Sequence, residues 1–362
     1  MKRKTILHIA EAFGGGIVTF IANLANEQCK GNYRVIVAHG IRKETHANYP
    51  DFFDDRIELI KIENFQQEIN LVSEWKAICE LRNIIKDTKP DVIHMHSSQS
   101  GVLGKLASIG CSAYKIYSPH GFAFLRQDVA SWKLQIFKAI EKIFSTCFKC
   151  QLVASSTTEY KEALKISKKA VLVFNGINTQ QLDSYFNVES SNERPVVGMV
   201  GRALPQKNPA FFNRIAEKMP HVQFEWIGDG DLRYQLTAPN IHIVGWGPRE
   251  EALEYVAKSD IYIMTSLWEG MPLALLEAMY LKKPCVVTNV VGNRDVIING
   301  ENGYICNTED EFVEKIQLLV NTPKLSSYFG EMAHQAVVEK YNSEAMAKQY
   351  EKLFIKTFKN RC

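Results

Sequence analysis

The chain alternates between short, almost continuously apolar segments and longer segments whose apolar residues recur at helical spacing. Continuous apolar runs are typical of strands buried on both faces, and apolar residues three or four positions apart are typical of the helices that cover them. The alternation therefore predicts an α/β fold. The expected strands, some with the turn that follows, are 5–10, 34–38, 91–97, 115–121, 151–154, 171–174, 195–201, 224–230, 241–248, 260–264 and 285–288.

Most of the segments between these strands have apolar residues at helical spacing. The chain of 362 residues is long for a single core and fits two domains, which we expect at 1–180 and 195–340 with a polar linker at 184–194. The segment 45–70 is polar and has no clear pattern. The expected helices are 17–24, 71–85, 101–108, 131–150, 272–281, 309–320 and 343–358, with another beginning at Pro209.

The chain is organised around the stretch 266–280, which leaves a strand and enters a helix. Pro272 falls at the first helical position, where its ring fixes φ and its missing N–H costs nothing, and Pro284 ends the helix. The first turn of a helix leaves backbone N–H groups unpaired. The amides between Gly270 and Leu273 are therefore free to bind an anion.

Two carboxylates frame this helix start, Glu269 in the loop and Glu277 in the helix. The two carboxylates of a glycosidase lie roughly 5–9.5 Å apart, whereas the helix rise between these two residues is about 12 Å. The pair fits better as two anchors along an extended ligand, one for a sugar hydroxyl and one for a ribose. A loop carboxylate and a solvated helix face are the alternative.

Two cations, Arg202 and Lys207, follow the strand 195–201 beside the helix that begins at Pro209. A planar guanidinium and a compact ammonium at a helix N-terminus suit a diphosphate, and they would neutralise charge on a departing nucleotide. Ordinary surface cations are the alternative interpretation.

The first domain offers a glycine turn and a histidine at strand ends. The glycines 14–16 let bare backbone approach a phosphate, although many α/β turns are equally rich in glycine. His120 stands where α/β sheets bind ligands and can accept a proton or bond a sugar hydroxyl near neutral pH, or it is structural. His94 and His96 share one face of a strand, and without a third ligand packing is favoured over a metal site.

The segment 131–150 predicts a basic amphipathic helix. It would lie on an anionic membrane, or it would cover a sheet with its lysines in water. The apolar segment Phe122–Leu125 is either a lip for a lipid-linked ligand or part of the core. The apolar stripe consists of Trp132, Ile136, Ile140, Ile143, Phe144 and Cys147, and the opposite side carries Lys138, Lys142, Ser145 and Lys149.

Composition narrows the class of protein. Hydrophobic residues make up 46% and charged residues 23% of the chain, and no apolar run is long enough for a membrane span. The basic N-terminus resembles the start of a signal peptide. His8 and Glu11 interrupt the apolar stretch that follows it, however, so a first strand is favoured. Residues 1–190 hold 24 Lys and Arg against 19 Asp and Glu, which favours an anionic partner. The eight scattered cysteines, including the pair Cys147 and Cys150, favour packing in a reduced cytoplasmic protein.

The stretch from Glu269 to Glu277 is similar to the E-x7-E element of glycosyltransferase family 4 (GT4), the retaining enzymes with the GT-B fold. The chain departs from the family pattern at Lys282, Val291 and Asp295, where members commonly have Gly, Gly and Glu. Lys282 predicts a helix end without the usual left-handed glycine. Three further segments fit the pattern, 284–288, 291–295 and 299–303.

The resemblance implies two Rossmann-like domains facing a central cleft, with the last helix at 341–362 crossing back to the first domain. It implies that Arg202 and Lys207 hold a donor diphosphate, that Glu277 holds the ribose and that His120 orients donor sugar and acceptor. The implied catalytic residues are His120, Glu269, Arg202 and Lys207. The implied substrate-binding residues are Gly15, Gly16, Gly270, Met271, Pro272, Leu273, Glu277 and Trp246.

We therefore expect a retaining glycosyltransferase that moves a sugar from a nucleotide-diphosphate sugar, most simply a UDP-sugar, to a saccharide linked to undecaprenyl diphosphate, as in capsule or O-antigen assembly. No Asp-x-Asp metal motif occurs, so no metal or other cofactor is expected, and no nucleic acid partner. The expected location is cytoplasmic or peripheral at the inner membrane face, with 131–150 as the contact. Alternatives are a synthase with a soluble acceptor, a nucleotide-sugar epimerase and a non-catalytic nucleotide-sugar binder.

Overall fold

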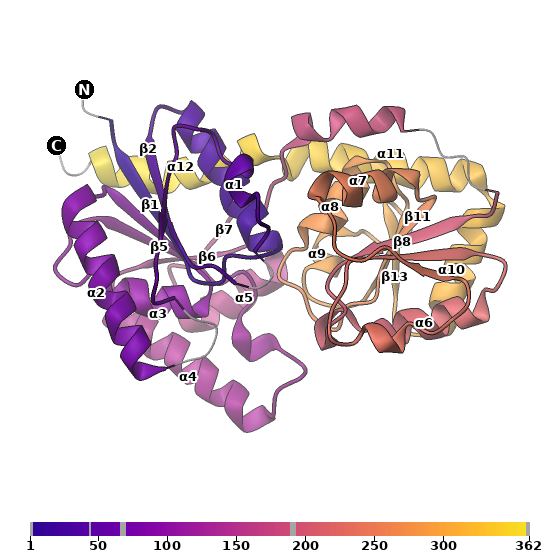
Figure 1. Ribbon diagram of the computed structural model, residues 1–362, viewed down its shortest axis with the longest axis horizontal. Coiled ribbons are helices and arrows are strands. Elements are labelled where there is room, and N and C mark those ends of the chain that lie inside the picture. The colour runs from indigo at the N-terminus through magenta and orange to yellow at the C-terminus, as the bar shows by residue number, and fades with distance from the viewer. Residues whose placement is uncertain (1–2, 43–44, 66–69, 189–192, 360–362) are drawn as a thin grey trace. The chain divides into compact units, whose positions relative to one another are not determined.

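The computed structural model describes residues 3–42, 45–65, 70–188 and 193–359, which form two compact units (Figure 1). The first unit combines the chain up to Gly176 with Ser343–Cys362, and the second unit spans Ile177–Asn342. The division falls before the polar segment in which a linker is expected. A short 3₁₀ helix, η4 Asp183–Asn187, overlaps the start of that segment and belongs to the second unit.

In the described part of the first unit, seven parallel strands form one sheet in the order β3-β2-β1-β4-β5-β6-β7. The strands are β1 Thr5–Ala10, β2 Arg34–His39, β3 Glu58–Lys61, β4 Val92–His96, β5 Tyr114–Ser118, β6 Gln151–Ala154 and β7 Val171–Leu172. The α-helices are α1 Gly16–Lys30, α2 Leu71–Thr88, α3 Ser98–Ala107, α4 Ser131–Cys147, α5 Thr157–Ile166 and α12 Ser343–Lys359.

The described part of the second unit holds a sheet of six parallel strands in the order β10-β9-β8-β11-β12-β13. The strands are β8 Val196–Val200, β9 Gln223–Ile227, β10 Ile241–Ile243, β11 Ile261–Met264, β12 Cys285–Thr288 and β13 Gly303–Cys306. The α-helices are α6 Pro209–Lys218, α7 Arg249–Lys258, α8 Leu273–Tyr280, α9 Asn293–Val296, α10 Glu309–Asn321 and α11 Pro323–Lys340.

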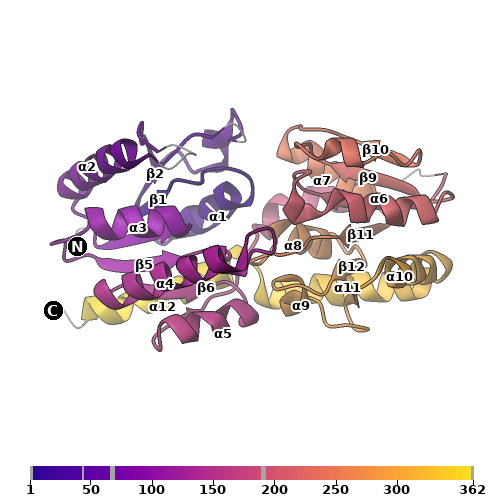
Figure 2. The same ribbon diagram turned by 90° about the horizontal axis from the view of Figure 1, so that it is seen from below.

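Each sheet is the middle layer of its own unit, with helices on both faces (Figure 2). Every residue of β1, β4 and β11 is buried, which requires cover on both faces and explains the continuous apolar runs in the sequence. The large side chains at the centre of the second unit include Trp226 and Tyr262, both fully buried. The α/β prediction is therefore confirmed, and each sheet is Rossmann-like in strand order.

Several elements escape the pattern. The irregular segment 45–70 contains β3, and the second unit contains β13 and the long helix α11, none of which was expected. Strand β3 has no buried residue, because it lies at the edge of the sheet, so it lacks the apolar run of a central strand. The predicted helix 101–108 begins earlier, at Ser98.

Both sheets reverse their strand order at one place, between β1 and β4 in the first unit and between β8 and β11 in the second. In open parallel sheets, ligands bind outside the carboxyl ends of the strands at this reversal point. The loops that leave β1 and β8 are the glycine turn 14–16 and the segment 201–207. The topology therefore brings the sequence-predicted residues to the expected edge of each sheet.

Candidate active site

In the second unit, the loops after β8 and β11 meet through an ion pair between Lys207 and Glu269. Lys207 Nζ lies 2.7 Å from Glu269 Oε1, and the two side chains are 16% and 8% exposed. Gln206 fixes the same carboxylate and loop, because its Nε2 donates to Trp268 O at 3.0 Å and to Glu269 Oε2 at 3.3 Å. Thr265 Oγ1 donates to the Lys207 carbonyl at 2.7 Å. A cation and an acid from separate motifs thus form one half-buried group.

A glycine after β8 makes room for this lysine. A Cβ added at Gly201 would lie 2.8 Å from Lys207 Cε, so any larger residue would displace the side chain that reaches Glu269. Arg202 is half-buried, and its backbone carbonyl accepts from Leu204 N at 2.7 Å. The ammonium of Lys207 therefore lies on Glu269, in the loop that precedes α8, and its contact with a diphosphate stays a prediction.

Helix α8 begins beside the acid Glu269. Pro272 is its N-cap residue with φ −74°, one position before the place expected from the sequence. In the described ranges, no intramolecular hydrogen bond is found for the N–H groups of Leu273 and Ala274. These amides carry the positive end of the helix dipole, so an anion placed there would be stabilised.

The segment 291–295 packs against the loop that precedes α8. Gly292 has φ +85°, and a Cβ added to it would lie 2.6 Å from the carbonyl oxygen of Gly270. Asp295 Oδ2 accepts from the Gly292 amide at 3.1 Å, so the aspartate that stands in place of the common glutamate still caps its short helix. Two polar atoms of this region, Ser266 Oγ and Asn293 Oδ1, are buried with no hydrogen-bond partner in the described part of the protein. Orphaned buried polar atoms often mark a place where a ligand or water completes the network.

The second acid, Glu277, is held by a residue that sequence reasoning missed. Arg249, the first residue of α7, donates from one of its terminal amino groups to Glu277 Oε1, and the side chains are 18% and 12% exposed. This pair engages one oxygen of the Glu277 carboxylate, and among the described residues no hydrogen bond is found for the other oxygen. Arg249 follows Pro248 at a strand-to-helix junction, which is the only signal in the sequence that could have found it.

The remaining predicted residues of the second unit have mixed surroundings. Met271, Pro272 and Leu273 are buried, so their backbone rather than their side chains is available to a ligand. Trp246 lies in the loop after β10 and is 62% exposed. The end of α8 has no left-handed glycine, as expected, and Lys282 adopts the left-handed conformation in its place, with φ +57°.

In the first unit, Gly15 and Gly16 stand where β1 turns into α1. Gly15 is the N-cap of α1 with φ +53°, and a Cβ added to either glycine would meet no atom within 4 Å. The open space beside both residues lets a ligand approach the backbone closely. The glycines are therefore not explained by packing alone.

His120 lies in a left-handed conformation just after β5, with φ +55°. Its ring packs against Phe20, with centroids 4.4 Å apart, and Ser97 after β4 also has a positive φ, +77°. Non-glycine residues held in this region cost of order 1–3 kcal/mol and gather at functional sites. Two such residues stand at the carboxyl ends of the neighbouring strands β4 and β5, the edge at which a ligand is expected.

His120 is the outer member of a chain of histidines that runs into the sheet. Its Nε2 lies 2.9 Å from Nδ1 of His96, whose Nε2 lies 2.9 Å from Nδ1 of His8 on β1. His8 and His96 are buried, and burial lowers the pKa of both imidazoles, to about 4 for His8. Burial also lowers the pKa of His120 to about 4, so the three histidine rings of this row are neutral near pH 7.

The structure places a third histidine, His8, beside His94 and His96, for which no third metal ligand could be found in the sequence. His8, His94 and His96 bring one ring nitrogen each within 4.8 Å of one another. However, both nitrogens of His8 and of His96 already have hydrogen-bond partners, and His94 Nε2 lies 2.9 Å from Ser118 Oγ. The rings therefore form a hydrogen-bonded array, which agrees with packing rather than metal binding.

Helix α4 packs through a different face from the one the sequence suggests. Its inner contacts come from Leu134 and Phe137, which pack on the core, and from the buried Glu141. The apolar stripe faces solvent, which corrects the interpretation that it covers the sheet. Its exposed fractions are 62% for Trp132, 47% for Ile136, 39% for Ile140 and 58% for Ile143.

The segment Phe122–Leu125 belongs to the core, so the proposed lip is wrong. Phe122 and Phe124 are 2% and 7% exposed, and their rings stack with centroids 4.7 Å apart. The described cysteines are free thiols, and Cys147 is exposed while Cys150 is half-buried. In the described ranges, no helix combines the length and apolar character that a membrane span requires.

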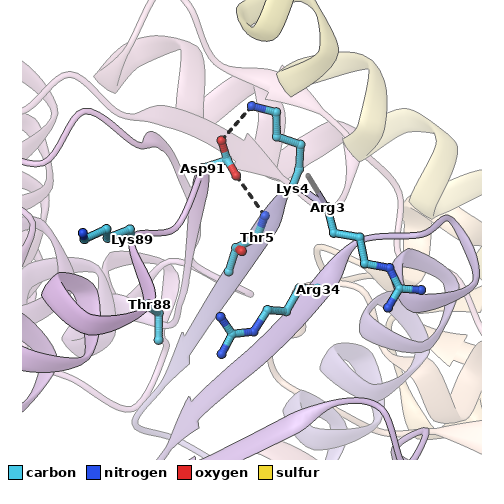
Figure 3. Close-up of a pocket in the computed structure, with 7 residues that line it drawn as sticks. All are labelled: Arg3, Lys4, Thr5, Arg34, Thr88, Lys89 and Asp91. Carbon is cyan, nitrogen blue, oxygen red and sulfur yellow. Dashed lines mark hydrogen bonds and ion pairs between the residues drawn. The ribbon is translucent and has the colours of Figure 1, made fainter. Parts of the chain in front are cut away.

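A hollow of about 350 Å³ lies at the opposite edge of the first sheet, where β1 and β2 begin (Figure 3). Lys4 Nζ lies 2.9 Å from Asp91 Oδ1, and Arg34 pairs with Glu58 at 2.9 Å. Much of its positive charge is thus neutralised, and it lies away from the carboxyl ends of the strands. It is lined by Arg3, Lys4, Thr5, Arg34, Thr88, Lys89 and Asp91.

Two family models match the chain. Residues 14–181 match the model described as Glycosyltransferase Family 4, and residues 180–336 match the model described as Glycosyl transferases group 1. Together with the two Rossmann-like sheets, these matches define a glycosyltransferase with the GT-B fold. The chain belongs to glycosyltransferase family 4, the family that the Glu269–Glu277 motif resembles.

Individual proteins support this assignment. The chain is 28% identical over 348 residues to UDP-Gal:α-D-GlcNAc-diphosphoundecaprenol α-1,3-galactosyltransferase of Escherichia coli, covering 86% of this chain and 87% of that enzyme. It is 23% identical over 327 residues to the capsular polysaccharide biosynthesis glycosyltransferase CapM of Staphylococcus aureus, covering 82% and 85%. The structure of sucrose-phosphate synthase from Thermosynechococcus elongatus has the same fold, with a TM-score of 0.84 at 18% identity over 99% of this chain and 100% of that one.

Proposed function

We propose that this glycosyltransferase moves a sugar from a UDP-sugar to a hydroxyl of an undecaprenyl-diphosphate-linked saccharide in surface polysaccharide assembly. The observation that carries the donor half is the Lys207–Glu269 pair at the start of α8. The acceptor half is supported by the E. coli relative, whose name specifies a UDP-sugar donor and a diphosphoundecaprenol acceptor. The S. aureus relative supports the link to capsular polysaccharide.

In the proposed reaction the acceptor hydroxyl attacks the anomeric carbon on the face that the nucleotide vacates, so the anomeric configuration is retained. Lys207, Arg202 and the first amides of α8 stabilise the negative charge that grows on the departing diphosphate. Glu269 and the backbone at Gly270 hold the transferred sugar. These cations and amides do the work that Mg²⁺ does in other phosphate chemistry, so the reaction needs no metal.

Two further contacts orient the substrates. Glu277, held by Arg249 through one oxygen, accepts a hydrogen bond from the ribose with the other. His120 hydrogen-bonds a hydroxyl of the donor sugar or of the acceptor. The backbone at Gly15 and Gly16 approaches the donor diphosphate and the acceptor, since no atom fills the space beside either Cα.

The first test is nucleotide release from a panel of UDP- and GDP-sugars, with and without a GlcNAc-diphosphate acceptor carrying a short polyprenyl chain. We expect release of UDP from one UDP-sugar, stimulated by the acceptor and unchanged by EDTA. The anomeric configuration of the isolated product, read from its one-bond carbon–proton coupling, should match that of the donor. UDP release at the same rate with and without the lipid acceptor would contradict the proposal. So would conversion of the donor sugar to its epimer.

Membrane contact through α4 is part of the proposal. Its exposed stripe of Trp132, Ile136 and Ile143 is apolar, and Lys133 and Lys142 of the same helix are exposed, which together suit an anionic membrane surface. The location that follows is the inner face of the cytoplasmic membrane. The free thiols of the described cysteines fit that reducing compartment.

We expect the triple variant Trp132→Ser, Ile136→Ser, Ile143→Ser to lose co-sedimentation with phosphatidylglycerol vesicles. Each lost side chain should cost roughly tenfold in the partition coefficient, given about 1.5 kcal/mol for apolar burial. High salt should weaken binding of the original protein as well. The matched control is the double variant Tyr328→Ser, Val338→Ser. It removes two exposed apolar side chains of the second unit, of which Tyr328 is 53% and Val338 48% exposed. Equal sedimentation of the two variants would exclude α4 as the contact.

A further inference from the structure

The histidine chain of the first unit ends at a buried glutamine. Gln28 on α1 is 5% exposed, and its Oε1 lies 2.8 Å from His8 Nε2. From there the chain continues from His8 to His96 and from His96 to His120 through two contacts of 2.9 Å. Four side chains from four separate elements thus form one continuous line of hydrogen bonds, from the helix to the edge of the sheet.

Such a line has only two possible proton arrangements. A neutral imidazole has one N–H and one lone pair, so each ring that donates on one side must accept on the other. Because Gln28 presents its carbonyl oxygen, His8 donates from Nε2 and accepts at Nδ1 from His96 Nε2. His96 in turn accepts at Nδ1 from His120 Nε2, which leaves His120 Nδ1 with its lone pair. The opposite arrangement needs the Gln28 amide nitrogen against His8 and gives His120 an Nδ1–H.

The residues around the row Gln28–His8–His96–His120 keep its rings neutral and rigid. The ring of His94 lies tilted against that of His96 with centroids 4.0 Å apart, and the centroid of the Tyr350 ring lies 4.9 Å from that of His94. No carboxylate contacts a ring nitrogen of His8, His96 or His120 in the described part of the chain. In Ser-His-Asp enzymes a carboxylate selects the tautomer of the working histidine. Here a neutral amide holds that position, at the far end of two intervening rings.

We propose that Gln28 is a positioning residue that sets the tautomer of His120 through His8 and His96. His120 then presents Nδ1 as a hydrogen-bond acceptor, which selects a substrate hydroxyl that donates. The role of His120 toward substrate rests on the proposed function, whereas the tautomer of its ring does not. Gln28 itself lies on α1 and acts on the ligand only through the rings.

The test is ¹⁵N NMR of the full chain labelled at histidine, compared with Gln28→Met and Gln28→Glu. In the original protein His120 should show a protonated Nε2 and an unprotonated Nδ1. Gln28→Met removes the acceptor, so the two tautomers of His120 should mix and kcat should fall by about tenfold to a hundredfold, with the Kd for UDP unchanged. Gln28→Glu restores an oxygen acceptor and should restore the Nε2–H tautomer.

The control is Gln99→Met, a matched change at a half-buried amide whose Nε2 donates to Glu74 at 2.6 Å. It should leave the histidine spectrum as it is. An Nδ1–H on His120 in the original protein, a spectrum that Gln28→Met does not change, or stoichiometric zinc bound by the rings would each overturn the proposal. If Gln28→Met shifts the tautomer and no nucleotide sugar is turned over, the positioning role holds and the proposed function fails. If Gln28→Met does not fold, the original protein and Gln28→Glu still decide the tautomer.

Discussion

Replacing Lys207 by alanine is expected to lower turnover of the nucleotide sugar by about 10²–10³, the usual cost of removing one preorganised group that faces developing negative charge. Its ammonium is the only cation that contacts Glu269 in the described residues, and it stands beside the start of α8. UDP release under saturating donor measures the loss. Titration of UDP by calorimetry should show weaker binding in the same variant.

The substitution also affects stability, because it leaves the 8% exposed Glu269 without its partner. Removing one member of a buried ion pair typically costs about 3–5 kcal/mol. The double variant Lys207→Met, Glu269→Gln removes both charges, so it should unfold near the original temperature while remaining inactive. Lys218→Ala, an exposed lysine that pairs with Asp310 and Glu309, is the control and should keep full activity. Normal turnover in Lys207→Ala would remove this residue from the site.

Acidification is expected to destabilise the first unit between about pH 6.5 and pH 4. Burial lowers the pKa of His8 to about 4 from an ordinary 6.5, so the unfolded chain binds more protons than the folded chain in this interval. The free energy of unfolding therefore falls as the pH drops through 6.5, and the loss ends near 4. For His8 alone the difference is roughly 3 kcal/mol. The buried rings of His94 and His96 add to it in the same direction.

Urea unfolding at pH 7, 5.5 and 4.5, read by deuterium uptake of peptides from β1 and β4, measures the effect. His8→Asn should reduce the pH dependence in these peptides. His221→Asn, at an exposed histidine of the second unit, should leave it unchanged. A stability of β1 that is equal at pH 7 and pH 4.5 would contradict the neutral, buried state of the rings.

The parts of the site that could be predicted are those carried by local patterns. Lys207 and Glu269 stand in separate sequence motifs at strand ends, and parallel topology brings such ends together at one edge of a sheet. The same rule placed His120 and the glycine turn. Strands β1, β4 and β11 were predictable because burial on both faces leaves short, mostly apolar runs.

The parts that could not be predicted depend on register and on which face packs. Arg249 meets Glu277 across two helices, and nothing in either segment shows that contact. His8 joins His94 and His96 only because β1 pairs with β4 in a register that sets His8 opposite His94. The apolar stripe of α4 suggested an inner face, but tertiary packing uses Leu134 and Phe137 instead and leaves the stripe outside.

The last helix, α12, has a consequence for how this chain is made. It belongs to the first unit (Figure 1). There Tyr350 OH lies 3.1 Å from Ser118 Oγ, and Glu351 accepts from Tyr33 OH at 2.7 Å. A ribosome therefore synthesises the whole of the second unit before it delivers the segment that completes the first. The nascent first unit must wait with α1 and the end of β5 uncovered, and a chain stopped before Ser343 would be released with that surface open to chaperones and proteases.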